Sequence, residues 1–101
     1  METYLVERYL PGMSSLEMLG AAARAESSSA ELRAEGVPVQ YLGSMFVPGE
    51  ESCFCQFEAS SAEAVAEVNE RAKIPYARIL PVLHIRAGAS EQARAGGLAV
   101  R

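Results

Sequence analysis

The chain of 101 residues contains no aspartate and no tryptophan, and it has one histidine and one lysine. Two-metal phosphoryl chemistry usually relies on aspartates, and phosphate-binding loops need a lysine framed by glycines. Neither pattern occurs in this sequence. Thirteen acidic residues against nine basic ones give a formal net charge of −4, which repels phosphate backbones. We therefore expect no nucleic-acid partner.

Long apolar runs are also missing from the sequence. No segment approaches the ~18 consecutive apolar residues of a membrane-spanning helix. The N-terminus carries Glu2 where a signal peptide needs positive charge. We therefore expect a cytoplasmic protein that does not interact with membranes. The two cysteines, Cys53 and Cys55, should then be reduced.

Four strands and two helices are expected before residue 86. β-branched and aromatic segments indicate the strands, and a Ser-Ser-x-Glu capping box indicates the start of each helix, at Ser14 and at Ser60. These patterns predict strands at 4–10, 37–47, 52–58 and 78–85 and helices at 14–35 and 60–74. Pro75 stops the second helix because proline cannot continue it.

The length of the first helix and the position of Pro81 limit how these elements pack. A straight helix over 14–35 would be ~33 Å long, more than the ~26 Å of an eight-residue strand. The serines at 27–29 are therefore expected to break it, or its second half to project. Pro81 cannot donate a backbone hydrogen bond, which predicts that the last strand lies at a sheet edge. Residues 86–101 show no clear period and are expected to form a flexible tail, or a loosely held helix near 90–94.

The order of the predicted elements, β-α-β-β-α-β, is the signature of the ferredoxin-like split arrangement. Right-handed crossovers place the strands in the order 4-1-3-2, which gives an α+β fold with a four-stranded antiparallel sheet. Residues 1–85 are expected to form one ferredoxin-like domain, with residues 86–101 as its C-terminal tail.

Both faces of this sheet carry large apolar side chains, although two helices can cover only one face. The face expected under the helices holds Tyr4, Val6, Cys53, Cys55, Phe57, Ile79, Leu83 and Ile85. The second face is expected to hold Leu5, Tyr9, Leu42, Phe46, Phe54, Leu80 and Val82, with Glu7, Gln56, Glu58 and His84 among them. An open apolar patch of that size is unusual for a monomer, so we expect a homodimer that packs sheet against sheet as a dimeric α+β barrel.

The polar residues of the second face are the candidates for chemistry. His84 could ligate a metal or act as a general base oriented by Glu7 or Glu58, and it could equally be a half-exposed residue near a strand end. Glu7 could instead form an ion pair with Arg8 or Arg78. Glu58 could complement the dipole of the helix that follows it.

The pair Cys53-x-Cys55 suits soft metal ions by its chemistry. Two thiolates on one ion lie about 3.5–4 Å apart, whereas side chains at positions i and i+2 of a flat strand lie ~6.5 Å apart. This spacing also disfavours a disulfide. We therefore expect both cysteines in the core, and a metal-ligand role only if the strand is bulged.

Three motifs occur in order along residues 3–85. They are Tyr4-Leu5-Val6-Glu7-Arg8 closed by Pro11-Gly12, Cys53-Phe54-Cys55-Gln56-Phe57-Glu58-Ala59, and Ile74-Pro75 followed by Arg78-Ile79 and Val82. Together they resemble a family of small bacterial domains of unknown function that includes a nickel-binding protein. The resemblance implies a ferredoxin-like fold paired into a dimeric α+β barrel. Gly43 and Leu80-Pro81 depart from the family pattern, which tends to have polar or acidic residues there, and each departure removes a potential metal ligand.

Three functions are compatible with these features. In the first, a divalent transition metal such as nickel or zinc, or a small ligand, binds in the interior of the homodimer. The candidate metal ligands are His84, Glu7, Glu58, Cys53 and Cys55, and the candidate ligand-binding residues are Glu7, Tyr9, Gln56 and Glu58. In the second, the dimer is a cofactor-free isomerase or oxygenase in which His84 or Glu7 moves a proton. In the third, it is a purely structural dimer.

Overall fold

The computed structural model describes residues 1–89 and contains six elements in the predicted order. The elements are β1 (Glu2–Tyr9), α1 (Ser15–Ala34), β2 (Val39–Val47), β3 (Ser52–Ala59), α2 (Ala62–Arg71) and β4 (Arg78–Val82). The strands form one sheet in the order β2-β3-β1-β4, and each neighbouring pair is antiparallel. The predicted ferredoxin-like α+β fold and its strand order are confirmed. The part of the predicted tail from residue 90 onward, including the helix near 90–94, lies outside the described residues.

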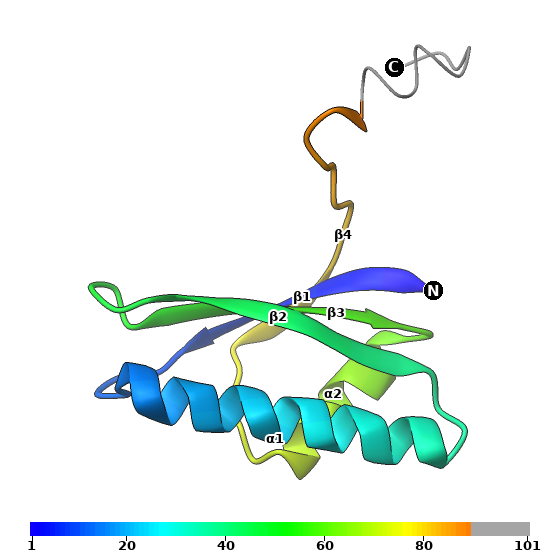
Figure 1. Ribbon diagram of the computed structural model, residues 1–101, viewed down its shortest axis with the longest axis horizontal. Coiled ribbons are helices and arrows are strands. Elements are labelled where there is room, and N and C mark those ends of the chain that lie inside the picture. The colour runs from blue at the N-terminus through cyan, green and yellow to red at the C-terminus, as the bar shows by residue number, and fades with distance from the viewer. Residues whose placement is uncertain (90–101) are drawn as a thin grey trace.

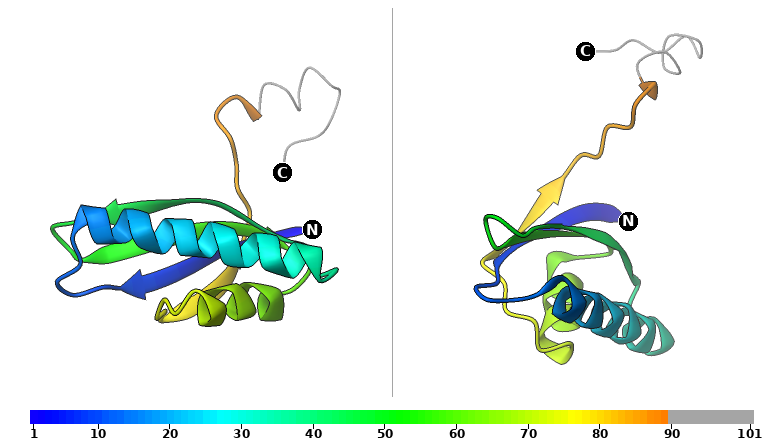
Figure 2. Two further views of the ribbon diagram at one scale, coloured as in Figure 1. Left: turned by 60° about the horizontal axis from the view of Figure 1, so that its bottom comes forward. Right: turned by 60° about the vertical axis from the view of Figure 1, so that its left-hand side comes forward.

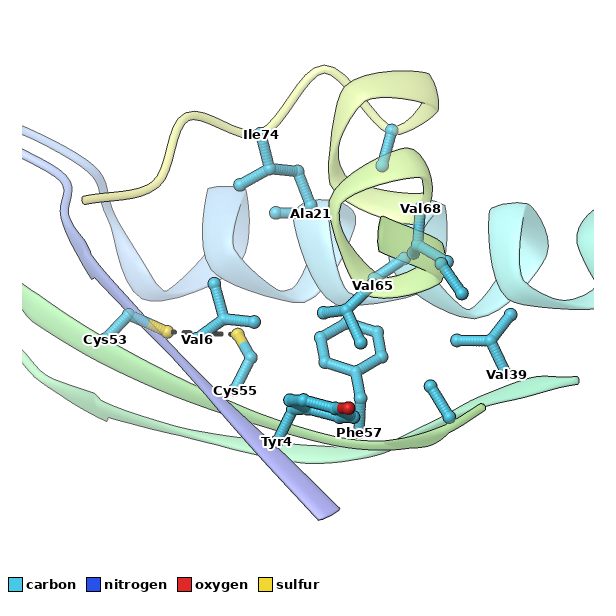
Figure 3. Packing of buried hydrophobic residues seen from close by; sticks show 14 of the residues in the cluster. Tyr4, Val6, Ala21, Val39, Cys53, Cys55, Phe57, Val65, Val68 and Ile74 are labelled. Carbon is cyan, nitrogen blue, oxygen red and sulfur yellow. Dashed lines mark hydrogen bonds between the residues drawn. The ribbon is translucent and has the colours of Figure 1, made fainter. Parts of the chain in front are cut away.

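Both helices lie on one face of the sheet, and no helix of residues 1–89 lies on the other (Figure 1, Figure 2). This helix-free face is termed the open face. Between the helices and the sheet lies the core, in which Val6, Phe57, Val65 and Val68 are fully buried (Figure 3). Among the predicted core residues, Tyr4, Val6, Cys53, Cys55 and Phe57 are buried, and Ile79 packs against them partly buried. The core therefore occupies one side of the sheet.

Helix α1 is continuous over 20 residues, so the predicted break at the serines 27–29 is wrong. The buried Ser29 hydroxyl donates to the backbone carbonyl of Ala25 at 2.8 Å, which satisfies it inside the helix. Length does not force a break, because 20 helical residues span ~30 Å and the nine residues of the neighbouring β2 span about the same. Neither helix within residues 1–89 is both long and apolar enough to cross a membrane.

The two helix starts differ from each other. At α1, Ser14 and Glu17 form the predicted capping box, in which the backbone N–H of each residue donates to the side chain of the other. At α2 the capping residue is Ser61, whose hydroxyl accepts the backbone N–H three residues later at 3.2 Å. The predicted capping box at Ser60 is therefore wrong: the N-cap lies one residue later, and Ala64 at the third helical position has no side chain that could complete a box. Ser60 instead donates its backbone N–H to the Pro38 carbonyl at 3.1 Å, which ties the end of β3 to the entry of β2.

Strand β4 ends at Val82, three residues before the predicted end. The last pair in its register with β1 is Thr3 with Val82, close to where β1 begins, so the following residues have no strand to pair with. Leu83 and Ile85, predicted in the core, are consequently 83% and 70% exposed, and both assignments are wrong. The edge position of β4, predicted from Pro81, is confirmed.

A β-bulge in β2 moves Phe46 to the helix-covered face. The register with β3 shifts between Tyr41 and Gly43, where the backbone φ of Gly43 is 149°, a conformation that favours glycine. The extra residue turns every later side chain of β2 to the opposite face from the one that simple alternation predicts. Phe46 therefore pairs with the buried Cys53 and packs against the core. The prediction that Phe46 lies on the open face is wrong, and Met45 takes that position.

Candidate functional site

The open face carries apolar side chains from all four strands. The strand registers and exposures place on it Leu5, Tyr9, Leu42, Met45, Val47, Phe54, Leu80 and Val82. Several are well exposed, with Tyr9 at 61% and Met45 at 70%. No helix of the described residues covers them (Figure 2). The apolar open face expected from the sequence is therefore present.

A hollow of about 590 Å³ lies on this face where β4 leaves the sheet. Its polar lining residues are Glu2, Thr3, Gln56, Glu58, His84 and Arg86. The Gln56 amide nitrogen lies 3.1 Å from Nδ1 of His84, which positions the imidazole against the sheet although His84 follows the strand. Because an amide nitrogen donates, Nδ1 accepts this hydrogen bond, and the proton of a neutral ring lies on Nε2. The structure thus brings three predicted site residues together: Gln56, Glu58 and His84.

A second hollow of about 330 Å³ adjoins the first, and His84 and Gln56 line both. The rest of its lining is largely apolar and includes Leu5, Met45 and Phe54. The His84–Gln56 pair therefore stands between carboxylates on one side and apolar side chains on the other.

Two predicted site residues lie outside the first hollow. Glu7 pairs with Arg78 across the β1–β4 ladder, with 2.5 Å between Glu7 Oε2 and Arg78 Nε, and this contact raises the pKa of Arg78. Of the two arginines proposed as partners of Glu7, Arg78 is the one found. Tyr9 lies at the end of β1 remote from Glu2, which lines the hollow. Neither Glu7 nor Tyr9 therefore lines the hollows beside His84.

The two cysteines lie on the helix-covered face and are buried (Figure 3). Their sulfurs are 3.7 Å apart, so the predicted wide separation is wrong. The strand is not bulged there, because Cys55 and Cys53 pair in unbroken register with Val6 and Arg8. The side chains instead lean toward each other along the strand. The hydrogen bond from the Cys53 thiol lowers the pKa of Cys55 and raises that of Cys53, and the Ser44 hydroxyl also donates to Cys55, at 2.9 Å.

Arg8 is buried on the same face, with 3% of its surface exposed. Its guanidinium donates to the Asn69 side-chain oxygen at 2.7 Å and to the Pro75 carbonyl at 3.3 Å, and both partners are neutral. Its Nε atom is buried without a hydrogen-bond partner among the described residues. Arg8 lies two residues after Val6 on β1 and therefore points to the same face of the sheet, so its burial could have been predicted. Its partners could not, because Asn69 is 61 residues away in sequence.

The metal-ligand candidates are divided by the sheet. Cys53 and Cys55 lie on the helix side, Glu58 and His84 lie on the open face, and Glu7 is held in an ion pair. Within residues 1–89, no three histidine, cysteine or acidic side chains lie close enough together to hold one ion. The imidazole and carboxylate of the open face suit Ni²⁺, Zn²⁺ or Cu²⁺ by donor type, but one protomer has too few of them for a closed site.

Glu2 is a further carboxylate beside the hollow that sequence reasoning missed. Its side chain accepts a hydrogen bond from the Tyr4 hydroxyl at 3.0 Å. The predicted first strand begins at Tyr4, two residues late, and therefore leaves Glu2 out of the sheet. Extending the ladder to Ala59, which pairs with Glu2, would have put Glu2 on the helix-covered face with Tyr4, so the alternation along the strand gives no signal of its place beside the hollow.

Comparison with known proteins agrees with this fold. The family model described as nickel responsive protein SCO4226-like matches residues 4–82. The crystal structure of SCO4226 from Streptomyces coelicolor A3(2) matches with a TM-score of 0.72 and 21% sequence identity, over 83% of this chain and 99% of that chain. No curated protein matches the sequence. The resemblance drawn from the three motifs is confirmed, and this chain belongs to the SCO4226-like family of nickel responsive proteins.

Proposed function

We propose that this protein binds a divalent transition-metal ion between the open faces of two copies of the chain, with His84 and Glu58 of each copy as ligands. The observation that supports the proposal is the hollow in which these two side chains lie together on an uncovered face. The family description supports nickel as the ion.

We propose that a second copy of the chain covers the open face, because the large exposed side chains of this face are apolar. Residues 83–89 leave the sheet on the open-face side and carry the exposed side chains of Leu83 and Ile85 (Figure 1). A second protomer packed face to face would remove both the apolar sheet surface and residues 83–89 from water. Burial of apolar surface is the main driving force of association. A two-fold axis lets each protomer cover the other with the same surface.

Two-fold symmetry also doubles the donor set. Each protomer brings the imidazole of His84 and the carboxylate of Glu58, so a pair brings two nitrogen donors and at least two oxygen donors. Such a mixed set suits Ni²⁺ and Cu²⁺. Gln56 would orient each imidazole once its amide is turned over, so that its Oε1 accepts the Nδ1–H while Nε2 of His84 binds the ion. The proposed activity is reversible metal binding.

The test is a calorimetric titration of the untagged full-length chain with Ni²⁺. We expect one ion per two chains. Losing the partner of a metal-bound histidine typically weakens binding ~10–100-fold, so we expect that loss for Gln56→Ala and more than ~100-fold for His84→Ala. Glu58→Gln should also weaken binding, whereas Glu26→Gln, on the exposed surface of α1, should not. Absence of binding by the parent chain, or equal binding by His84→Ala, would overturn the proposal.

A further inference from the structure

The cysteine pair takes no part in the proposed nickel site, and the cation of Arg8 is buried beside it on the helix side of the sheet. We propose that Cys55 is a thiolate that pairs with Arg8 and that hydrogen peroxide oxidises to a sulfenic acid. This modification site is complete within one chain, and the sheet separates it from the open-face hollow.

Arg8 is a buried cation that has no carboxylate partner among residues 1–89. Its guanidinium donates to the neutral Asn69 side chain and the Pro75 carbonyl, and its Nε atom is buried without a hydrogen-bond partner among these residues. A buried charge is costly unless a counter-ion lies nearby. In the register of β1 with β3, Arg8 lies opposite Cys53, two residues along from the position opposite Cys55. A thiolate in the cysteine pair supplies the missing negative charge.

Of the two cysteines, Cys55 is the one that its neighbours favour as the anion. Its sulfur accepts the Ser44 hydroxyl at 2.9 Å and lies 3.7 Å from the sulfur of Cys53, whose thiol donates to it (Figure 3). These hydrogen bonds and the charge of Arg8 lower the pKa of Cys55, whereas the pKa of Cys53 is raised. The charged or titratable groups beside Cys55 are Arg8 from β1, Cys53 from β3 and Tyr41 from β2. No carboxylate is among them.

A hollow of about 400 Å³ between α1 and β2 reaches Ser44, the residue that contacts Cys55. Its lining is largely apolar, and the hydroxyls of Ser44 and Tyr41 lie 2.5 Å apart beside it. The lining residues that the structure describes carry no charge that would hold an ionic reagent. Cys55 itself is 2% exposed, so its sulfur is open only to a very small molecule. Hydrogen peroxide is a soft oxidant that is both small and neutral.

The reaction is a two-electron oxidation of the thiolate. The sulfur of Cys55 attacks one oxygen of the peroxide, so a sulfur–oxygen bond forms while the oxygen–oxygen bond breaks. The second oxygen leaves as hydroxide, which takes a proton from solvent and becomes water. The product stays a sulfenic acid, because a disulfide needs Cβ atoms about 3.5–4.5 Å apart and positions i and i+2 of a regular strand lie ~6.5 Å apart. The register of β3 with β1 is regular at both cysteines.

The test is exposure of the untagged, reduced chain to hydrogen peroxide at neutral pH, followed by unfolding in dimedone, which labels sulfenic acids and not oxidised methionines. We expect an adduct on Cys55, located by tandem mass spectrometry, and none in Cys55→Ser. Cys53→Ser is the matched control, because a serine hydroxyl still donates to Cys55, and it should form the adduct. Rates are compared in this variant, since it has no second thiol to consume the sulfenic acid after unfolding.

Arg8→Met, made in the Cys53→Ser chain, tests the role of the buried cation. Without the guanidinium, Cys55 should ionise like an ordinary cysteine, which is only a few per cent thiolate at neutral pH, so the rate should fall ~10-fold or more. A higher pH should restore the rate, because it ionises the thiol. If Arg8→Met does not fold, the ultraviolet absorption of a thiolate in the parent at neutral pH, lost in Cys55→Ser, provides the same test. A parent chain with no thiolate absorption or no adduct, an adduct on Cys53 instead, or an undiminished rate in folded Arg8→Met would overturn the proposal.

Discussion

Phe57→Ala is expected to destabilise the fold by ~3–5 kcal/mol, because it removes a large side chain from the core and leaves a cavity. Phe57 has no exposed surface, and its ring packs on Tyr41 with 5.4 Å between ring centroids. It lies between the sheet and α2, where Val65 also packs (Figure 3). Urea unfolding followed by circular dichroism measures the loss as a lower transition midpoint.

Phe54→Ala is the matched control for this result. Phe54 lies three residues earlier on the same strand, points to the open face and is partly exposed. Its removal should weaken association of the chains and cost the isolated protomer much less than Phe57→Ala. Equal losses of protomer stability for the two variants would contradict the assignment of the core to one face of the sheet.

Asn69→Ala is expected to cost ~3 kcal/mol, because it leaves the buried guanidinium of Arg8 without its closest hydrogen-bond partner. Asn69 is fully buried and also donates to the Val65 carbonyl at 2.8 Å, so the variant loses two hydrogen bonds. The measurement is a double-mutant cycle of denaturant unfolding with Arg8→Met. We expect the double variant to lose ~1–3 kcal/mol less than the sum of the single losses.

Additive losses in that cycle would contradict direct coupling between Arg8 and Asn69. Arg33→Met provides a comparison, since Arg33 also donates to a backbone carbonyl, at 2.9 Å to Val39, but is exposed. The loss of stability in Arg33→Met should be small, because the guanidinium that it removes is exposed and its hydrogen bond competes with water.

Much of the topology could be predicted because local signals agree with the tertiary arrangement. The capping box at Ser14, the edge proline Pro81 and the alternation along β1 and β3 each follow from short-range chemistry. The errors arise where a distant element decides the outcome. β4 stops because β1 offers no further partner, and Phe46 changes face because a bulge shifts one residue of β2.

The candidate site was predictable in part for the same reason. The alternation of side chains along the strands places Gln56, Glu58 and His84 on the open face. The structure shows that His84, which follows the end of β4, is held there by its contact with Gln56. The spacing of the cysteines was not predictable, because it depends on side-chain rotamers and not on the ~6.5 Å repeat of a strand. The burial of Arg8 follows parity, but its pairing with Asn69 requires the three-dimensional fold.

The proposed pairing of two open faces is tested most directly by analytical ultracentrifugation of the full chain at micromolar concentration. We expect a dimer, and we expect Leu42→Glu, which puts a charge on the open face, to dissociate it into folded protomers. Leu16→Glu, at an exposed leucine of α1 on the helix side, should remain dimeric. A parent chain that stays monomeric at these concentrations would contradict the proposed pairing of open faces.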